Sequence, residues 1–148
     1  MPIEIVHVVT DELLAAFARL SPQLSETMTP PTRQQLEEIV ASAVTSLLIA
    51  RDPDGQGEII GTLTLAVYRS PAGVSAHIED VVVEQKARGN GTGAALTRAA
   101  LDLAAEKGAK KVDLTSRPSR EAANRLYQRL GFVLWNTNFY RYVIEKES

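Results

Sequence analysis

The chain has 148 residues, 45% of them hydrophobic and 23% charged, and its formal net charge at pH 7 is −2. This length and composition are typical of one globular domain that buries its own core, so we expect a single domain over residues 1–148. The small net charge gives no electrostatic case for binding nucleic acid or an anionic membrane. The absence of cysteine excludes disulfides, thiolate metal sites and a cysteine acyl-enzyme.

The first third of the chain predicts a strand followed by two helices. β-Branched residues alternate over residues 3–9, as in a half-buried strand. Thr10 or the residue after it can cap a helix that carries an apolar stripe. Residues 21–31 are expected to form a loop because they are polar and contain prolines. Thr32 and Gln35 have the spacing of a capping box, which predicts a second helix.

The middle of the chain predicts an antiparallel hairpin and a third strand. Residues 46–51 and 59–68 favour strands and flank a turn rich in glycine and aspartate. A second turn, around Pro71, leads to a strand that ends in Val83. The helical pattern that follows is expected to stop at Gly108, a plausible C-cap.

The last third predicts a strand over residues 111–115, a helix capped near Ser119 and ended by Gly131, and two final strands over residues 132–135 and 139–144. The predicted order is therefore β α α β β β α β α β β. An early antiparallel meander followed by crossover helices predicts an α/β (α+β) fold. Its mixed, mostly antiparallel central sheet would have about seven strands, with about four helices on its two faces.

The stretch with the clearest chemical meaning is the glycine turn after Val83. Arg88 is followed by Gly89, Gly91 and Gly93, and then by a pattern of helical period. Such a turn leaves backbone N–H groups unpaired at a helix N-terminus, where the helix dipole adds partial positive charge. Glycines let the backbone approach a ligand closely and adopt positive φ. We therefore predict a phosphate-binding turn.

Two nucleotide-binding motifs are alternative explanations of this glycine turn. A nucleoside-triphosphate P-loop is excluded, because no lysine follows the glycines until Lys107. Gly89, Gly91 and Ala94 match the loose dinucleotide fingerprint. That fingerprint should directly follow a strand in an opening βαβ unit, whereas here residues 84–88 intervene and half of the chain comes first. A nucleotide-binding module therefore stays as the last alternative.

A third pattern, Arg/Gln-x-x-Gly-x-Gly/Ala, is met by Arg88, Gly91 and Gly93 after a hydrophobic strand. It resembles the acetyl-coenzyme A site of the GNAT superfamily of N-acetyltransferases. Residues 124–132 resemble the family's late helix, which ends in Tyr-x-x-x-Gly-Phe. The resemblance extends over residues 59–144, and the N-terminal third of the chain fits it only in outline.

The resemblance implies an acetyl-CoA-dependent N-acetyltransferase that moves an acetyl group to a primary amine by direct attack in a ternary complex. The acceptor stays open among small amines, amino sugars, polyamines, aminoglycosides and peptide amines. Residues 21–31, with the start of the second helix, are the candidate specificity segment. The alternative is a non-catalytic acyl-CoA-binding or sensing module on the same fold.

The cofactor-binding residues are expected on the turn, on the preceding strand and on the late helix. The turn would hold the pyrophosphate of coenzyme A through backbone N–H groups, with Arg88 adding charge or bracing the turn. The resemblance implies that the last strand residues pair with the pantetheine arm and that one of their N–H groups polarises the acetyl carbonyl. The expected set is Val81, Val82, Val83, Arg88, Gly89, Asn90, Gly91, Thr92, Gly93, Ala94, Asn124 and Tyr127.

The expected catalytic residues are Tyr127, Glu79 and Asp80. A phenol with a pKa of about 10 is protonated at neutral pH and can donate to the departing thiolate. The alternative for Tyr127 is packing against the neighbouring leucines alone, and the alternative for Asn124 is a position on the surface. Side chains alternate along a strand, so Glu79 and Asp80 should point to opposite faces. We favour Glu79 as the base, directly or through water, since it shares parity with Val81 and Val83; a structural ion pair is the alternative.

Other polar residues suggest no further site. His7 and His77 have no second ligand at metal spacing, so we expect them to pack and expect no metal. The arginines of the late segment, Arg117, Arg120, Arg125 and Arg129, either touch the 3′-phosphate of coenzyme A or form a solvated face. No leader pattern or membrane-length apolar window occurs, so a cytoplasmic protein is expected. Residues 139–144 could pair across a homodimer.

Overall fold

The computed structural model describes residues 2–145. The chain divides into two compact units, Met1–Thr115 and Ser116–Ser148. The first unit contains a five-stranded sheet, three α-helices and a short 3-10 helix, and the second contains one α-helix. The elements are β1 (Ile3–Ile5), α1 (Asp11–Leu24), α2 (Arg33–Ala41), β2 (Thr45–Arg51), β3 (Ile59–Ser70), β4 (Gly73–Val83), η1 (Gln85–Ala87), α3 (Thr92–Glu106), β5 (Val112–Asp113) and α4 (Glu121–Arg129).

Both predicted helix caps near the N-terminus are confirmed. Thr10 Oγ1 accepts a hydrogen bond of 3.1 Å from the Leu13 N–H at the start of α1. At α2, Thr32 Oγ1 accepts from the Gln35 N–H, and Gln35 Oε1 accepts in return from the Thr32 N–H. This reciprocal pair satisfies two N–H groups that a helix start otherwise leaves unpaired.

The predicted loop over residues 21–31 is wrong in its first part, because α1 continues to Leu24 and includes Pro22. Proline lacks an N–H and is costly inside a helix. Here the apolar stripe runs on both sides of Pro22: Leu20, before it, is fully buried, and Leu24, after it, packs against the same core cluster. Burial of these leucines offsets the helix bond that Pro22 cannot make, so tertiary packing decides the end of the helix.

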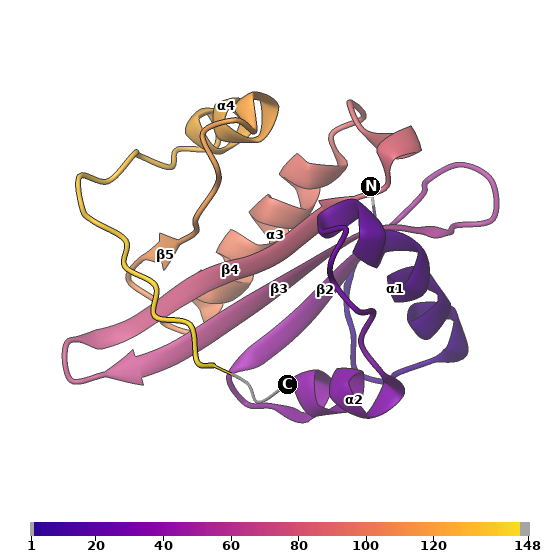
Figure 1. Ribbon diagram of the computed structural model, residues 1–148, viewed down its shortest axis with the longest axis horizontal. Helices are drawn as coiled ribbons and strands as arrows, with labels where there is room; N and C mark the ends of the chain where they lie inside the picture. The colour runs from indigo at the N-terminus through magenta and orange to yellow at the C-terminus, as the bar shows by residue number, and fades with distance from the viewer. Residues whose placement is uncertain (1, 146–148) are drawn as a thin grey trace. The chain divides into compact units, whose positions relative to one another are not determined.

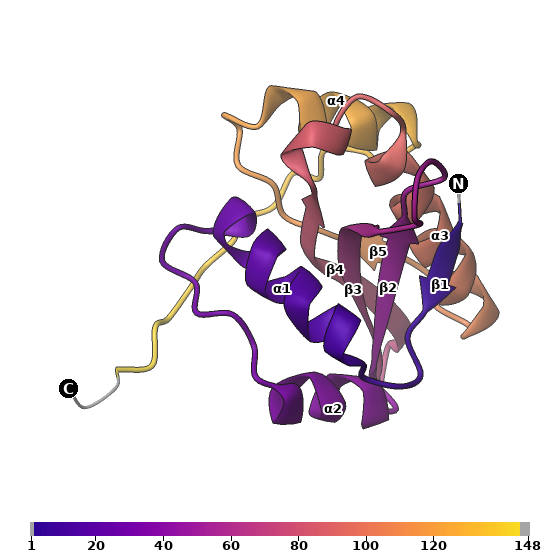
Figure 2. The same ribbon diagram turned by 90° about the vertical axis from the view of Figure 1, so that its right-hand side faces the viewer.

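The sheet has the order β1-β2-β3-β4-β5, in which only the β4–β5 pair is parallel. The predicted hairpin is confirmed as β2 and β3. One face carries α1 and α2, where Leu36, Leu47 and Val82 join the buried core. The opposite face carries α3, and Figures 1 and 2 show α1 and α3 on opposite sides of the strands.

The predicted number of about seven strands is wrong, because the structure has five strands in the residues that it describes. The four α-helices there agree with the predicted number. The segments 132–135 and 139–144 form no strand there, and residues 111–115 contribute only Val112–Asp113 to the sheet. Their aromatic and β-branched residues favour strands, but β-propensity is realised only when a neighbouring strand pairs with the segment. The predicted dimer through residues 139–144 stays a prediction.

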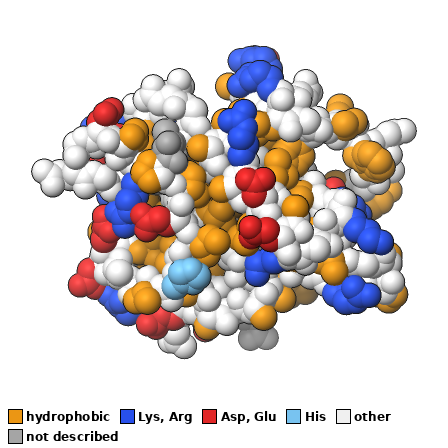
Figure 3. Space-filling view, turned by 180° about the vertical axis from the view of Figure 1, so that it is seen from behind, with side chains coloured by type: hydrophobic (Ala, Val, Ile, Leu, Met, Phe, Trp, Pro, Cys, Tyr) orange, Lys and Arg blue, Asp and Glu red, His pale blue; other side chains and the backbone are white. Residues whose placement is uncertain are grey.

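The distribution of charged side chains on the surface is consistent with the small net charge of the chain. On the face drawn in Figure 3, basic and acidic side chains are interspersed instead of gathered by sign. No helix among residues 2–145 is long and apolar enough to cross a membrane.

The helix α3 lies unusually close to β3, and Gly61 makes this approach possible. A Cβ at Gly61 would lie 2.9 Å from Leu96 Cδ1 and 3.2 Å from Thr92 Cγ2. We predict that Gly61→Ala lowers the free energy of unfolding by about 1–3 kcal/mol, the usual cost of overpacking, as measured by urea denaturation. The same change in a Leu96→Ala background should cost clearly less, because the clashing atom is gone. Equal costs in both backgrounds would contradict this explanation.

Candidate active site

The glycine turn connects β4 to α3 through η1. Arg88 Nε donates a 3.2 Å hydrogen bond to the Val83 carbonyl, so its side chain folds back on the end of β4. The Ala95 N–H donates to the Gly91 carbonyl at 2.9 Å and opens the helix. Bracing the turn is one of the two roles expected of Arg88, and this bond is of that kind. The other guanidinium nitrogens of Arg88 have no acceptor among residues 2–145.

Two glycines give the turn its shape. Gly89 has a φ of +86° and Gly91 a φ of +81°, both in the left-handed region. A Cβ at either position would meet nothing within 4 Å. Glycine is therefore required there by backbone conformation and not by lack of room.

The turn offers unpaired hydrogen-bond donors. Within residues 2–145, the backbone N–H groups of residues 89–94 have no acceptor. They stand at the N-terminus of a 15-residue helix, where the dipole favours an anion. The Thr92 side chain is 2% exposed, and its hydroxyl has no partner in the described part of the chain. The predicted phosphate-binding turn therefore has the donors that such a ligand needs.

The strand β4 contains a bulge two residues before its end. Thr64 pairs with Glu79 and Thr62 with Val82, so Asp80 and Val81 together oppose a single residue of β3. Asp80 has a φ of +52° and is the one non-glycine residue with positive φ in the described part of the chain. Bulges and strained residues of this kind concentrate at functional sites, where they redirect a side chain.

The bulge makes the predicted parity of Glu79 wrong. Glu79 pairs with Thr64 on the face that carries α1 and α2. Val83 pairs with Gly61, whose missing Cβ points at α3, so Val83 lies on the opposite face. Uninterrupted alternation would have put Glu79 and Val83 on one face. An extra residue in the strand resets the alternation.

The two acidic candidates differ in their surroundings. Glu79 Oε1 lies 3.1 Å from His77 Nε2, and the Glu79 side chain is 56% exposed. His77 is therefore a partner of Glu79, which the sequence did not predict. Asp80 lines a cavity of about 120 Å³ between the helices and the sheet. Asp80, and not Glu79, is thus the acid that the structure places at a pocket.

We call this cavity the helix–sheet pocket. It includes four members of the predicted specificity segment, and α1, α2, β2, β3 and β4 supply the rest. Its lining is Phe17, Ser21, Leu24, Met28, Pro31, Leu36, Ile39, Leu47, Thr62, Thr64, Asp80 and Val82. The two threonines and Phe17 were not predicted as site residues, because on sequence they are indistinguishable from other core-facing positions.

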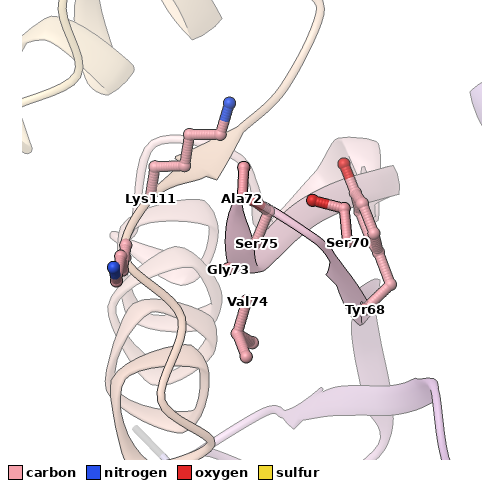
Figure 4. Close-up of a pocket in the computed structure, with 8 residues that line it drawn as sticks. Tyr68, Ser70, Ala72, Gly73, Val74, Ser75 and Lys111 are labelled. Atoms are coloured by element: carbon pink, nitrogen blue, oxygen red, sulfur yellow. The ribbon is translucent and has the colours of Figure 1, made fainter.

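A larger hollow, of about 440 Å³, lies at the far end of the β3–β4 hairpin. Tyr68 and Lys111 line opposite sides of it (Figure 4). Val74, in its wall, precedes Val83 by nine residues, which along a strand is roughly 30 Å. This hollow is therefore separate from the turn.

The second unit holds the late helix, α4. The helix begins near Ser119, as predicted, with Arg120 as its N-cap residue, but Arg120 makes no side-chain cap bond. The Asn124 side chain folds back on the segment before the helix: its Nδ2 donates to the carbonyls of Arg117, at 2.9 Å, and Arg120, at 2.8 Å. Its amide nitrogen is thus engaged locally, and only its amide oxygen is left for a ligand.

Tyr127 packs within this unit. Its ring meets the edge of the Phe132 ring at a centroid distance of 5.7 Å, and the Phe132 N–H donates to the Tyr127 carbonyl. Burial raises the pKa of the Tyr127 phenol, and nearby Arg120 lowers it in part. The phenol is therefore protonated at neutral pH, as a proton donor must be.

Residues 9–132 match the sequence model of a family described as the acetyltransferase (GNAT) family. The chain belongs to the GNAT family. This confirms the resemblance predicted from the glycine turn and from residues 124–132.

Similar proteins of known name agree with this assignment. A mycothiol acetyltransferase from Renibacterium salmoninarum is 34% identical over 126 residues, which are 84% of this chain and 36% of that protein. A protein of Oryza sativa subsp. japonica named probable glucosamine 6-phosphate N-acetyltransferase 2 is 37% identical over 59% of this chain and 53% of its own length. The chain thus spans about a third to a half of these curated relatives.

A solved structure gives the same fold. An acetyltransferase of Trypanosoma brucei superposes with a TM-score of 0.74 and 26% identity, covering 96% of this chain and 100% of the other.

The strain at Asp80 gives a stability prediction. Asp80→Gly should leave the free energy of unfolding unchanged or raise it, because glycine adopts positive φ freely. Asp80→Val should lower it by about 1–3 kcal/mol, since a β-branched residue is strained in this conformation. Urea denaturation measures both, with Glu79→Val as the control at a regular strand position. A Val substitution equally tolerated at both positions would show that the bulge is not present in solution.

Proposed function

We propose that the chain is an acetyl-CoA-dependent N-acetyltransferase that moves an acetyl group to a primary amine by direct attack in a ternary complex. The single observation that carries the proposal is the family match over residues 9–132. The unpaired amides of the turn support it, because they suit the pyrophosphate of the co-substrate. The bulge beside them supports it as well, because it directs an acidic side chain to a pocket.

The co-substrate would be held by backbone groups. The amides of residues 89–94 would bind its pyrophosphate, and Arg88 would brace the turn and add positive charge. The family resemblance assigns the pantetheine arm to Val81, Val82 and Val83, whose side chains meanwhile pack. A backbone N–H near the bulge would polarise the acetyl carbonyl and stabilise the oxyanion.

The reaction needs a neutral amine and a proton for the thiolate. The amine nitrogen would attack the thioester carbon, and the carbon–sulfur bond would break as the tetrahedral intermediate collapses. We assign the orientation and deprotonation of the amine to Asp80, directly or through water, because Glu79 already has His77 as a partner. Tyr127 would donate its proton to the departing sulfur, and the raised pKa keeps that proton available.

The acceptor stays open among the classes of amine given above, and the name of the Oryza sativa relative makes glucosamine 6-phosphate one compound to test. The second candidate function is a non-catalytic acyl-CoA sensor. It would need the turn but neither Asp80 nor Tyr127.

The turn is tested by a matched pair of strained variants. Gly91→Val should weaken acetyl-CoA binding by about tenfold or more, because valine at positive φ costs over 1 kcal/mol and displaces the amides. Gly55→Val is the control: Gly55 has a φ of +64° with equally open surroundings, but lies in the β2–β3 turn. Calorimetric titration with acetyl-CoA, coenzyme A and NAD compares the ligands. Absence of coenzyme A binding by the unaltered protein would contradict the proposed function.

The proton donor is tested by Tyr127→Phe. This variant should lose about ten- to a thousandfold in kcat while its affinity for acetyl-CoA is unchanged. Because the acid acts in its protonated form and its pKa is raised, the activity that it supports should fall only as pH rises beyond about 10. That alkaline limb should disappear in the phenylalanine variant. Unchanged turnover across the pH range would remove Tyr127 from the mechanism and favour another donor.

A further inference from the structure

The residues that line the helix–sheet pocket restrict the class of amine that it can bind as an acceptor. Eight of its twelve lining residues are apolar: Phe17, Leu24, Met28, Pro31, Leu36, Ile39, Leu47 and Val82. Asp80 is the one charged residue in the lining, and no lysine, arginine or histidine contributes to it. A pocket of this composition attracts a single positive charge and apolar surface.

The apolar walls are fixed before any ligand binds. Leu36, Leu47 and Val82 belong to the buried core, with 0%, 1% and 4% of their surfaces exposed. Asp80, in contrast, is exposed. The pocket therefore runs from a solvent-accessible carboxylate to a rigid apolar end. Its volume of about 120 Å³ is similar to that of cavities, about 150 Å³, that admit benzene.

We propose that the acceptor is a primary amine on a compact apolar body, such as a branched alkylamine or an arylalkylamine, with its ammonium group at Asp80 and its hydrocarbon between α1, α2 and the sheet. This inference rests on the proposed function for the reaction but not for the binding. A phosphorylated amino sugar fits this site poorly, because its phosphate would find no cation in the lining and would be repelled by Asp80.

The test compares amines as acetyl acceptors. The amines are 3-methylbutylamine, 2-phenylethylamine, glucosamine and glucosamine 6-phosphate, and thiol release from acetyl-CoA is followed with a thiol reagent. The chain has no cysteine, so all of the thiol signal comes from coenzyme A. We expect kcat/KM for the two apolar amines to exceed that for both sugars by about tenfold or more. A preference for either sugar would overturn the inference.

A matched pair of variants locates the site. Met28→Arg puts a cation into the pocket wall from a half-buried loop position, and should raise KM for 3-methylbutylamine by about tenfold. Thr29→Arg adds the same charge at the exposed neighbouring residue, which does not line the pocket, and should change KM little. Thermal unfolding checks that both variants are folded. Equal effects of the two variants on KM would show that the amine does not bind in the helix–sheet pocket.

The remaining outcome separates this inference from the proposed function. If acetyl-CoA binds but no amine is acetylated, the proposed function fails, and binding of 3-methylbutylamine is then measured by calorimetry without acetyl-CoA. Binding that is lost in Met28→Arg and kept in Thr29→Arg supports the inference. No binding to the unaltered protein, or binding equal to that of 3-methylbutanol, overturns it.

Discussion

The bulge in β4 is the constraint on which the candidate site of the first unit depends. Because Asp80 and Val81 share one partner on β3, alternation along the strand is reset between Glu79 and Val82. This single extra residue brings the Asp80 carboxylate to the helix–sheet pocket while Val82 stays in the core. The positive φ of Asp80 is held by the regular pairing on both sides of the bulge, in which Thr64 meets Glu79 and Thr62 meets Val82.

The two faces of the sheet carry the two different functions that we assign to the first unit. On one face, Gly61 lets α3 approach β3 closely, which fixes the position of the glycine turn at the start of α3. On the other face, α1 and α2 form the walls of the helix–sheet pocket. The strand β4 borders both the turn and the pocket. A co-substrate held at the turn and an acceptor held in the pocket would therefore meet at β4, as direct transfer requires.

The parts of this site that could be predicted are those encoded in local sequence. The caps at Thr10 and Thr32, the β2–β3 hairpin and the glycine turn each rest on residue types with a specific conformational preference. The bulge could not be predicted, because aspartate at positive φ leaves no signal comparable to glycine. The extension of α1 through Pro22 depends on burial of Leu20 and Leu24, and the missing strands depend on partners; neither is a local property.

The most direct test of the account is to map acetyl-CoA onto the chain by backbone amide chemical shifts in NMR titrations. The account predicts that the amides of residues 89–94 and of Val81 to Val83 shift together and saturate with one affinity, while those at the hairpin end near Val74 are unaffected. Shifts confined to the hairpin end, or no saturable shifts at the turn, would contradict the claim that this turn holds the co-substrate.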